Sequence, residues 1–186
     1  MKSEGYILSE FAHLDVDDNR THFPLWSNAA YICDDGQTRK EKAVELTQPV
    51  ASRFNESMMY RCVQQGKPFV FDGTLRNKEL SLRYCTDAKH ERLLTLVTDD
   101  PRQELRVVVI LVSTELDVAM TRVESRRLLT GRPVQEDFVR SSNLDARETA
   151  DMAEGYDAVD LVVRIDNSAT DGTPPKFLDP THAAKL

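Results

Sequence analysis

Three short segments of the chain carry polar side chains of the kinds that move protons or bind phosphate. The first spans residues 14–20 (LDVDDNR), in which Asp15, Asp17 and Asp18 precede Arg20. At the end of a strand, an aspartate near an arginine can act as a general base or bind Mg²⁺. Three aspartates in four positions also fit a turn and a helix cap. The pattern alone leaves both interpretations open.

The second segment, residues 71–76 (FDGTLR), follows an apolar run. Asp72 or Thr74 can hydrogen-bond a substrate hydroxyl. Gly73 lets a ligand approach the backbone, and Arg76 can bind phosphate. A strand that ends in a plain Asp-Gly turn explains the same residues equally well.

The third segment holds four arginines within eleven residues of an acidic chain: Arg122, Arg126, Arg127 and Arg132. Arginine suits bidentate phosphate contacts and stabilises charge in phosphoryl transfer. The alternative is a solvated helix face on which Glu124 pairs with Arg127 three residues later.

The elements that position these segments can be read from apolar patterns. Four apolar runs predict strands, at residues 12–16, 68–72, 107–112 and 160–165. The last two are rich in Val and Ile, which is typical of parallel strands covered on both faces. Ligands bind at the carboxyl ends of such strands, so we expect the polar segments to lie at that edge.

Helical patterns lie between the predicted strands. We expect helices over residues 48–65, 115–130 and 135–153, and a helix with a loop over 87–105. Gly66 is placed to end the first helix and Gly131 the second. Strands that alternate with helices favour one layered α/β domain. Residues 167–186, rich in Pro, Thr, Asp and Ala, predict a flexible tail.

Composition limits the classes of function. The net charge is −7, which argues against nucleic acid or an anionic membrane as the partner. No apolar run approaches the length of a membrane-spanning helix. The three cysteines lie far apart, which gives no metal-binding spacing and predicts a reducing compartment, the cytoplasm.

The seven glycines limit the chemistry further. Gly66 and Gly73 form the closest pair, and a phosphate-binding loop needs two glycines five positions apart followed by Lys and Ser or Thr. The sequence therefore contains no glycine-rich phosphate loop of its own.

Taken in chain order, the segments over residues 10–166 resemble the zeta toxin family, the P-loop kinases of bacterial toxin–antitoxin systems. That family has a strand ending in I-D-x-D-x-x-R/K-x-x-x-P, an R-x-x-E helix start and a strand ending in E-G-T-x-R. An R-Y-E helix and an arginine–proline element follow. The matching stretches here are residues 14–24, 53–56, 72–76, 122–124 and 131–134.

The resemblance implies a reaction and a set of site residues. Characterised members phosphorylate UDP-N-acetylglucosamine with ATP and Mg²⁺, and an antitoxin protein is a further partner. By resemblance, Asp17 is the general base, and Arg122 and Arg132 bind the ATP phosphates. The residues that bind the substrate would be Arg20, Glu56, Asp72, Thr74 and Arg76. No metal ligand is assigned.

The sequence also departs from the family pattern. Asp72 stands where the family has Glu, Val123 replaces Tyr, and the first strand with its phosphate loop is missing. We therefore expect a P-loop kinase-like parallel sheet layered with helices that lacks this strand and loop. Residues 1–166 would form the truncated kinase domain, with impaired activity. The alternatives are a non-catalytic binding module, or pseudokinase, for an antitoxin or sugar nucleotide, and an α/β protein whose likeness is accidental.

Overall fold

The computed structural model describes residues 10–27, 39–96, 104–130 and 134–185. The chain divides into two compact units. Unit 1 comprises Met1–Gly73 and His90–Leu105, and unit 2 comprises Thr74–Lys89 and Arg106–Leu186. Each unit has its own strands and its own buried residues.

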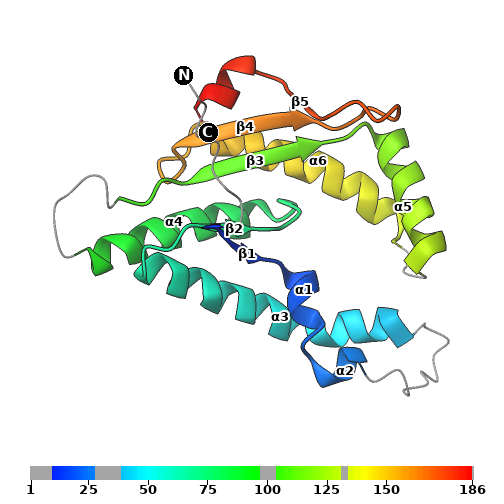
Figure 1. Cartoon of the computed structure of the whole chain (residues 1–186), viewed down its shortest axis with the longest axis horizontal. Coiled ribbons are helices and arrows are strands. Elements are labelled where there is room, and N and C mark those ends of the chain that lie inside the picture. Colours follow the sequence, from blue (N-terminus) through cyan, green and yellow to red (C-terminus); the bar gives the residue numbers. More distant parts are fainter. Residues whose placement is uncertain (1–9, 28–38, 97–103, 131–133, 186) are drawn as a thin grey trace. The chain divides into compact units, whose positions relative to one another are not determined.

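Unit 1 is built on two short parallel strands. β1 (Ala12–Leu14) pairs with β2 (Phe69–Phe71), with Leu14 opposite Phe71 at their carboxyl ends. Three helices, drawn from blue to teal in Figure 1, complete most of the unit: α1 (Val16–Arg20), α2 (Pro24–Ser27) and α3 (Arg39–Gln64). Strands are found within both predicted ranges, 12–16 and 68–72, but the first one ends at Leu14 and Val16 already begins α1.

The long helix α3 starts nine residues before its predicted start and ends as expected. Gly66 has φ of +63°, a left-handed conformation, and its N–H donates to the carbonyl of Val63. Glycine takes this conformation at no steric cost, so the helix ends here. The face of α3 that packs inside the unit is formed by Ala51, Asn55, Met59, Cys62 and Val63.

Unit 2 contains a three-stranded sheet in the order β3-β4-β5. β3 (Val108–Ser113) and β4 (Leu161–Asp166) are parallel, with Val109 opposite Val162, and β5 (Lys176–Phe177) runs antiparallel to β4. The helical elements are α4 (Lys78–Thr95), α5 (Leu116–Thr130), α6 (Glu136–Ala153) and the 3₁₀-helix η3 (Pro180–Ala184). The last residues of α4, from His90 on, belong to unit 1.

Helix α6 covers one face of the sheet in unit 2, as Figure 1 shows. Its small side chains Ala146, Ala150 and Ala153 pack against Val109, Leu111 and Val162, and Leu82 of α4 joins this cluster. Alanine on the inward face lets helix and sheet approach closely, so the apolar surfaces of both are removed from water.

The mixed α/β class with small parallel sheets layered with helices is confirmed. Within the described ranges the strands form two separate sheets rather than one. The division into a kinase domain over 1–166 and a flexible tail over 167–186 stays a prediction. The described part of that tail contains β5 and η3. No helix in the described ranges is long and apolar enough to span a membrane.

Candidate functional site

The first acidic segment forms the junction between β1 and α1 in unit 1. Asp15 is the N-cap of α1, and its side chain accepts a hydrogen bond from the N–H of Asp17 at 2.7 Å. The helix-cap interpretation therefore holds for Asp15. The carboxylate of Asp17 pairs with the guanidinium of Arg20, which is 2% exposed, while about half of the Asp17 side chain faces solvent.

A buried asparagine of α3 holds this junction in place. The Asn55 side-chain amide donates to the carbonyl of Leu14 at 2.9 Å, and its oxygen accepts from the amide of Asn19 at 2.6 Å. Asn55 is fully buried, so its bond to Leu14 is made away from water, whereas its bond to Asn19 is partly buried. α3 thus fixes both ends of the turn that carries Asp17. Glu56, predicted to bind the substrate, is the next residue of α3 and is partly buried.

Asp72 lies immediately after β2, close to the end of β1. Its N–H donates to the carbonyl of Leu14 at 3.0 Å, and its carboxylate lies 3.5 Å from Nε2 of His13. His13, Asp15 and Asp72 place one potential ligand atom each within 4.8 Å of one another.

These three residues do not fit the Mg²⁺ that ATP-dependent chemistry uses. Mg²⁺ prefers oxygen ligands, and the histidine offers a nitrogen. Asp15 also already accepts the capping hydrogen bond from Asp17. We therefore assign this group no part in binding the metal of a phosphoryl-transfer reaction.

The residues after Asp72 form an irregular segment that belongs to unit 2 from Thr74 on. Leu75 has φ of +53°, a conformation that costs a residue with a side chain roughly 1–2 kcal/mol. Its carbonyl accepts a hydrogen bond from the hydroxyl of Thr149 on α6 at 2.7 Å. The guanidinium of Arg76 lies over the ring of Phe138, 4.7 Å from its centre, and Lys78 pairs with Glu148.

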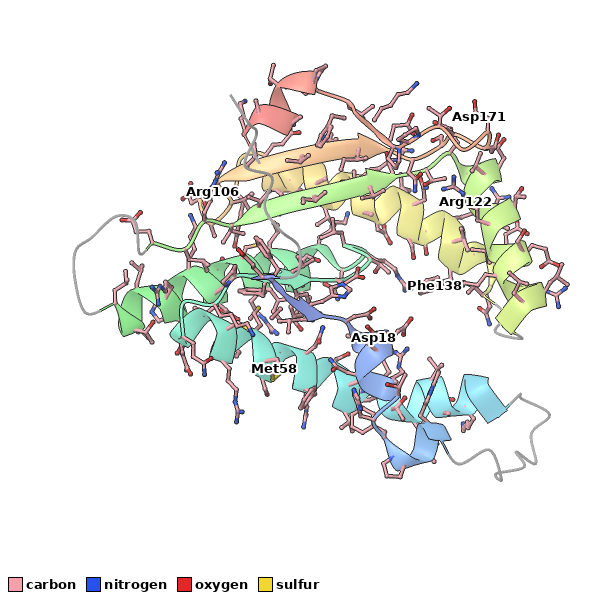
Figure 2. All side chains as sticks on the ribbon, viewed as in Figure 1. Asp18, Met58, Arg106, Arg122, Phe138 and Asp171 are labelled. Atoms are coloured by element: carbon pink, nitrogen blue, oxygen red, sulfur yellow. The ribbon has the colours of Figure 1, made fainter. Side chains whose placement is uncertain are left out.

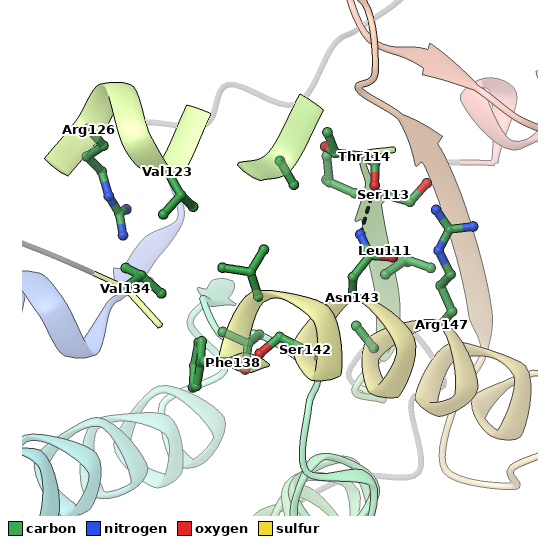
Figure 3. A pocket seen from close by; sticks show the side chains of 15 residues that line it. Leu111, Ser113, Thr114, Val123, Arg126, Val134, Phe138, Ser142, Asn143 and Arg147 are labelled. Atoms are coloured by element: carbon green, nitrogen blue, oxygen red, sulfur yellow. Dashed lines mark hydrogen bonds between the residues drawn. The ribbon is translucent and has the colours of Figure 1, made fainter. Parts of the chain in front are cut away.

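Unit 2 also contains a pocket of about 290 Å³ at the carboxyl end of β3, between α5 and α6 (Figure 3). Its walls are largely apolar, with polar groups from several elements. Arg126 of α5 and Arg147 of α6 lie at opposite sides of it in Figure 3. The pocket is lined by Thr74, Leu111, Val112, Ser113, Thr114, Ala119, Val123, Arg126, Val134, Phe138, Val139, Ser142, Asn143, Ala146 and Arg147.

Two polar side chains of α6, Ser142 and Asn143, line this pocket side by side. Asn143 donates to the carbonyl of Thr114 at 2.8 Å, the dashed bond in Figure 3. The hydroxyl of Ser142 is buried and has no hydrogen-bond partner within the described ranges. Apolar walls, a few polar groups and two guanidinium groups suit a ligand with an apolar or planar body and an anionic end.

The arginine-rich helix α5 uses its cations in different ways. Arg122 donates to the backbone carbonyls of Asn167 at 2.8 Å and Ala169 at 2.9 Å, so it fixes the turn that follows β4 (Figure 2). Arg127 forms two bonds to Glu124, at 2.8 and 2.7 Å, and this hydrogen bonding lowers the pKa of Glu124. The solvated-face interpretation therefore holds for that pair.

The predicted site residues are divided between the two units. Unit 1 holds Asp17, Arg20, Glu56 and Asp72, and unit 2 holds Thr74, Arg76 and Arg122. Arg132 lies outside the described residues. Among the predicted residues that the structure describes, Thr74 is the one that lines the pocket.

Sequence reasoning missed much of the pocket. The sequence signal that could have identified Arg126 is the arginine-rich segment to which it belongs. Ser142, Asn143 and Arg147 belong to a helix whose polar positions have no distinctive spacing, so no pattern singled them out.

A comparison with known protein families matches residues 4–171 to the family described as Zeta toxin. No curated protein and no solved structure matches the chain.

Proposed function

The chain belongs to the zeta toxin family, and on that premise we propose that it derives from a kinase that transfers the γ-phosphoryl group of ATP to a hydroxyl of a nucleotide sugar of the UDP-N-acetylglucosamine type. Family membership implies a kinase-like domain. Four finer points are part of our proposal: the nucleotide-sugar acceptor, a P-loop kinase-like fold, an antitoxin partner and a cytoplasmic location.

The observation that carries the proposal is the pocket at the carboxyl end of β3. Thr74, Arg126 and Arg147 all line this pocket. Thr74 comes from the segment that resembles the substrate-binding motif of the family. A nucleotide sugar offers what such a pocket can hold, because it combines planar and apolar surface with two phosphates.

The proposed reaction needs one base and several positive charges. Asp17 accepts the proton of the sugar hydroxyl while that oxygen attacks the γ-phosphorus. The bond from the γ-phosphorus to the bridging oxygen breaks, and ADP leaves with the electron pair. In this proposal Arg20, Glu56, Asp72, Thr74 and Arg76 bind the acceptor. Arg122 and Arg132 neutralise charge on the ATP phosphates. Bound Mg²⁺ would add charge neutralisation on the phosphates.

We further propose that the 186 residues by themselves catalyse this reaction poorly. The transition state of phosphoryl transfer is stabilised by backbone N–H groups and a lysine of the phosphate loop. The glycine positions of this sequence do not allow that loop.

A kinase assay with ATP and UDP-N-acetylglucosamine tests both parts of the proposal. We expect slow formation of the phosphorylated sugar nucleotide, and Asp17→Asn to abolish whatever turnover the parent shows. Asp18→Asn is the matched control, because Asp18 is an exposed neighbour on the same helix. Equal activity of the parent and the Asp17 variant refutes the assignment of the base. Turnover as fast as that of a family member with a complete phosphate loop refutes the impairment.

The second candidate function is a binding module that retains the sugar-nucleotide or antitoxin surface without catalysis. The pocket favours it, since this cavity is formed by residues of unit 2 and needs no phosphate loop. Calorimetry separates the two candidates. Binding of the sugar nucleotide without binding of ATP supports the module, and binding of both supports the kinase.

A further inference from the structure

The backbone of Leu75 is held in a conformation that its own sequence does not favour. Leucine rarely adopts the left-handed region, and Leu75 has φ of +53°. Its neighbours Thr74 and Arg76 are the two residues of unit 2 proposed to bind the acceptor. If Leu75 relaxed to an ordinary extended or helical conformation, the directions of both neighbouring side chains would change, because a rotation about φ turns the chain on either side of it.

Two contacts hold Leu75 in this conformation. Its side chain packs against the core cluster of unit 2. Its carbonyl accepts a hydrogen bond at 2.7 Å from the hydroxyl of Thr149, which is 1% exposed. The same hydroxyl lies 2.8 Å from the carbonyl of Asp145, one turn earlier in α6.

A second buried threonine, Thr47, shows that the bond from Thr149 to Leu75 is the additional one. Thr47 on α3 is also buried, and its hydroxyl donates to the carbonyl of Ala43 one turn earlier, at 2.6 Å. A bond within the helix is therefore sufficient to satisfy a buried threonine in this chain. The additional contact to Leu75, 74 positions away in the sequence, distinguishes Thr149.

We propose that Thr149 is a positioning residue: its hydroxyl fixes the left-handed backbone of Leu75 and thereby sets the directions of Thr74 and Arg76 toward the acceptor. The inference rests on the proposed function, which assigns those two residues to the acceptor. Thr149 acts through the backbone and does not itself touch the substrate. Other contacts of α6 support the same segment, since Phe138 lies under the guanidinium of Arg76 and Glu148 pairs with Lys78.

The experiment uses the full chain with four matched proteins: the parent, Thr149→Val, Thr149→Ser and Thr47→Val. Valine keeps the shape of threonine and removes the donor, whereas serine keeps the donor. Thr47→Val removes a buried hydroxyl whose bonds, among the residues that the structure describes, lie within its own helix, so it controls for that loss. If circular dichroism shows Thr149→Val to be unfolded, Thr149→Cys replaces it, because a thiol is a weak donor.

Two measurements report on the backbone without any need for kinase activity. The first is the three-bond coupling between the amide and α protons of Leu75, which depends on φ. The second is the rate of tryptic cleavage after Arg76, followed by mass spectrometry. We expect Thr149→Val to change the coupling and to accelerate cleavage about twofold to tenfold, the factor that corresponds to one hydrogen bond. Thr149→Ser and Thr47→Val should stay close to the parent.

The third measurement is the affinity for UDP-N-acetylglucosamine, by calorimetry or as KM. We expect Thr149→Val to weaken acceptor binding by about tenfold, with a smaller change in kcat, and Thr149→Ser to restore it. An unchanged coupling and cleavage rate in Thr149→Val overturns the proposal, and so does an equal effect of Thr47→Val. If the parent itself neither binds nor phosphorylates the sugar nucleotide, the proposed function fails. The first two measurements then still decide whether Thr149 fixes Leu75.

Discussion

The buried side chain of Asn55 links three elements of unit 1, namely α3, β1 and α1. It is fully buried in α3, and its amide connects the end of β1 to α1 through Leu14 and Asn19. We expect Asn55→Ala to destabilise unit 1 and to loosen the turn that carries Asp17.

The magnitude follows from the two bonds. An intramolecular hydrogen bond contributes about 0.5–1.5 kcal/mol net, so the loss of both costs about 1–3 kcal/mol. The carbonyl of Leu14 still accepts from the N–H of Asp72, at 3.0 Å, and Asn19 is partly exposed and can bond to water. Neither partner is left buried without a bond, so the hydrogen-bond contribution stays within that range, and the cavity left by the shorter side chain adds to it.

The assay is urea unfolding followed by the fluorescence of Trp26, the single tryptophan of the chain, which lies on α2 in unit 1. Ser57→Ala is the control, because the exposed Ser57 makes one bond within α3, to the carbonyl of Arg53. We expect the control to shift stability by less than about 0.5 kcal/mol. A free energy of unfolding for Asn55→Ala equal to that of the control would refute the assignment of Asn55 as the link between α3 and β1.

Two further predictions concern packing and pH. Met59→Ala should lower the stability of unit 1 by about 2–5 kcal/mol, because Met59 is buried, and Met58→Ala, at the partly exposed neighbour, should cost clearly less; equal losses in urea unfolding would contradict the burial of α3. Burial alone would raise the pKa of Asp160, but hydrogen bonds from Lys89 at 2.7 Å and from the N–H of Val107 at 2.6 Å outweigh it and lower that pKa. The carboxylate therefore stabilises unit 2 above the unfolded pKa of about 3.9, and this contribution is lost as the pH falls through the lowered folded value. Asp160→Asn should lower the free energy of unfolding by about 1 kcal/mol at neutral pH, and by progressively less below a pH of about 4, as followed by circular dichroism. A loss of unfolding free energy that stays the same at every pH would contradict this.

The positions of most elements could be predicted because their causes are local. Runs of β-branched residues at 107–112 and 160–165 form β3 and β4, which the structure places at Val108–Ser113 and Leu161–Asp166. Gly66 ends α3 because only its own backbone has to adopt a positive φ. These signals depend only on residues that are adjacent in the chain, so they can be recognised from the sequence alone.

The buried face of α3 could not be predicted in the same way. Residues Val50, Phe54, Met58 and Cys62 recur every four positions and predict an apolar face, but Val50 and Phe54 are 55% and 48% exposed. The inward face consists mainly of residues one position further on, Asn55 among them, and Cys62 is the buried member of the predicted stripe. A pattern based on hydrophobicity cannot assign an asparagine to the interior. Its burial is stabilised by a carbonyl 41 positions earlier in the sequence.

The candidate site shows the same division. The sequence by itself determined the acidic turn, the DGTLR segment, the arginine-rich helix and the family to which they belong. The tertiary structure decided that Arg122 holds backbone carbonyls, that Arg126 and Arg147 line a common pocket, and that Leu75 is left-handed. These features depend on which distant groups meet across β3, β4 and α6, and hydrogen bonds between residues 45 or 74 positions apart leave no trace in local spacing.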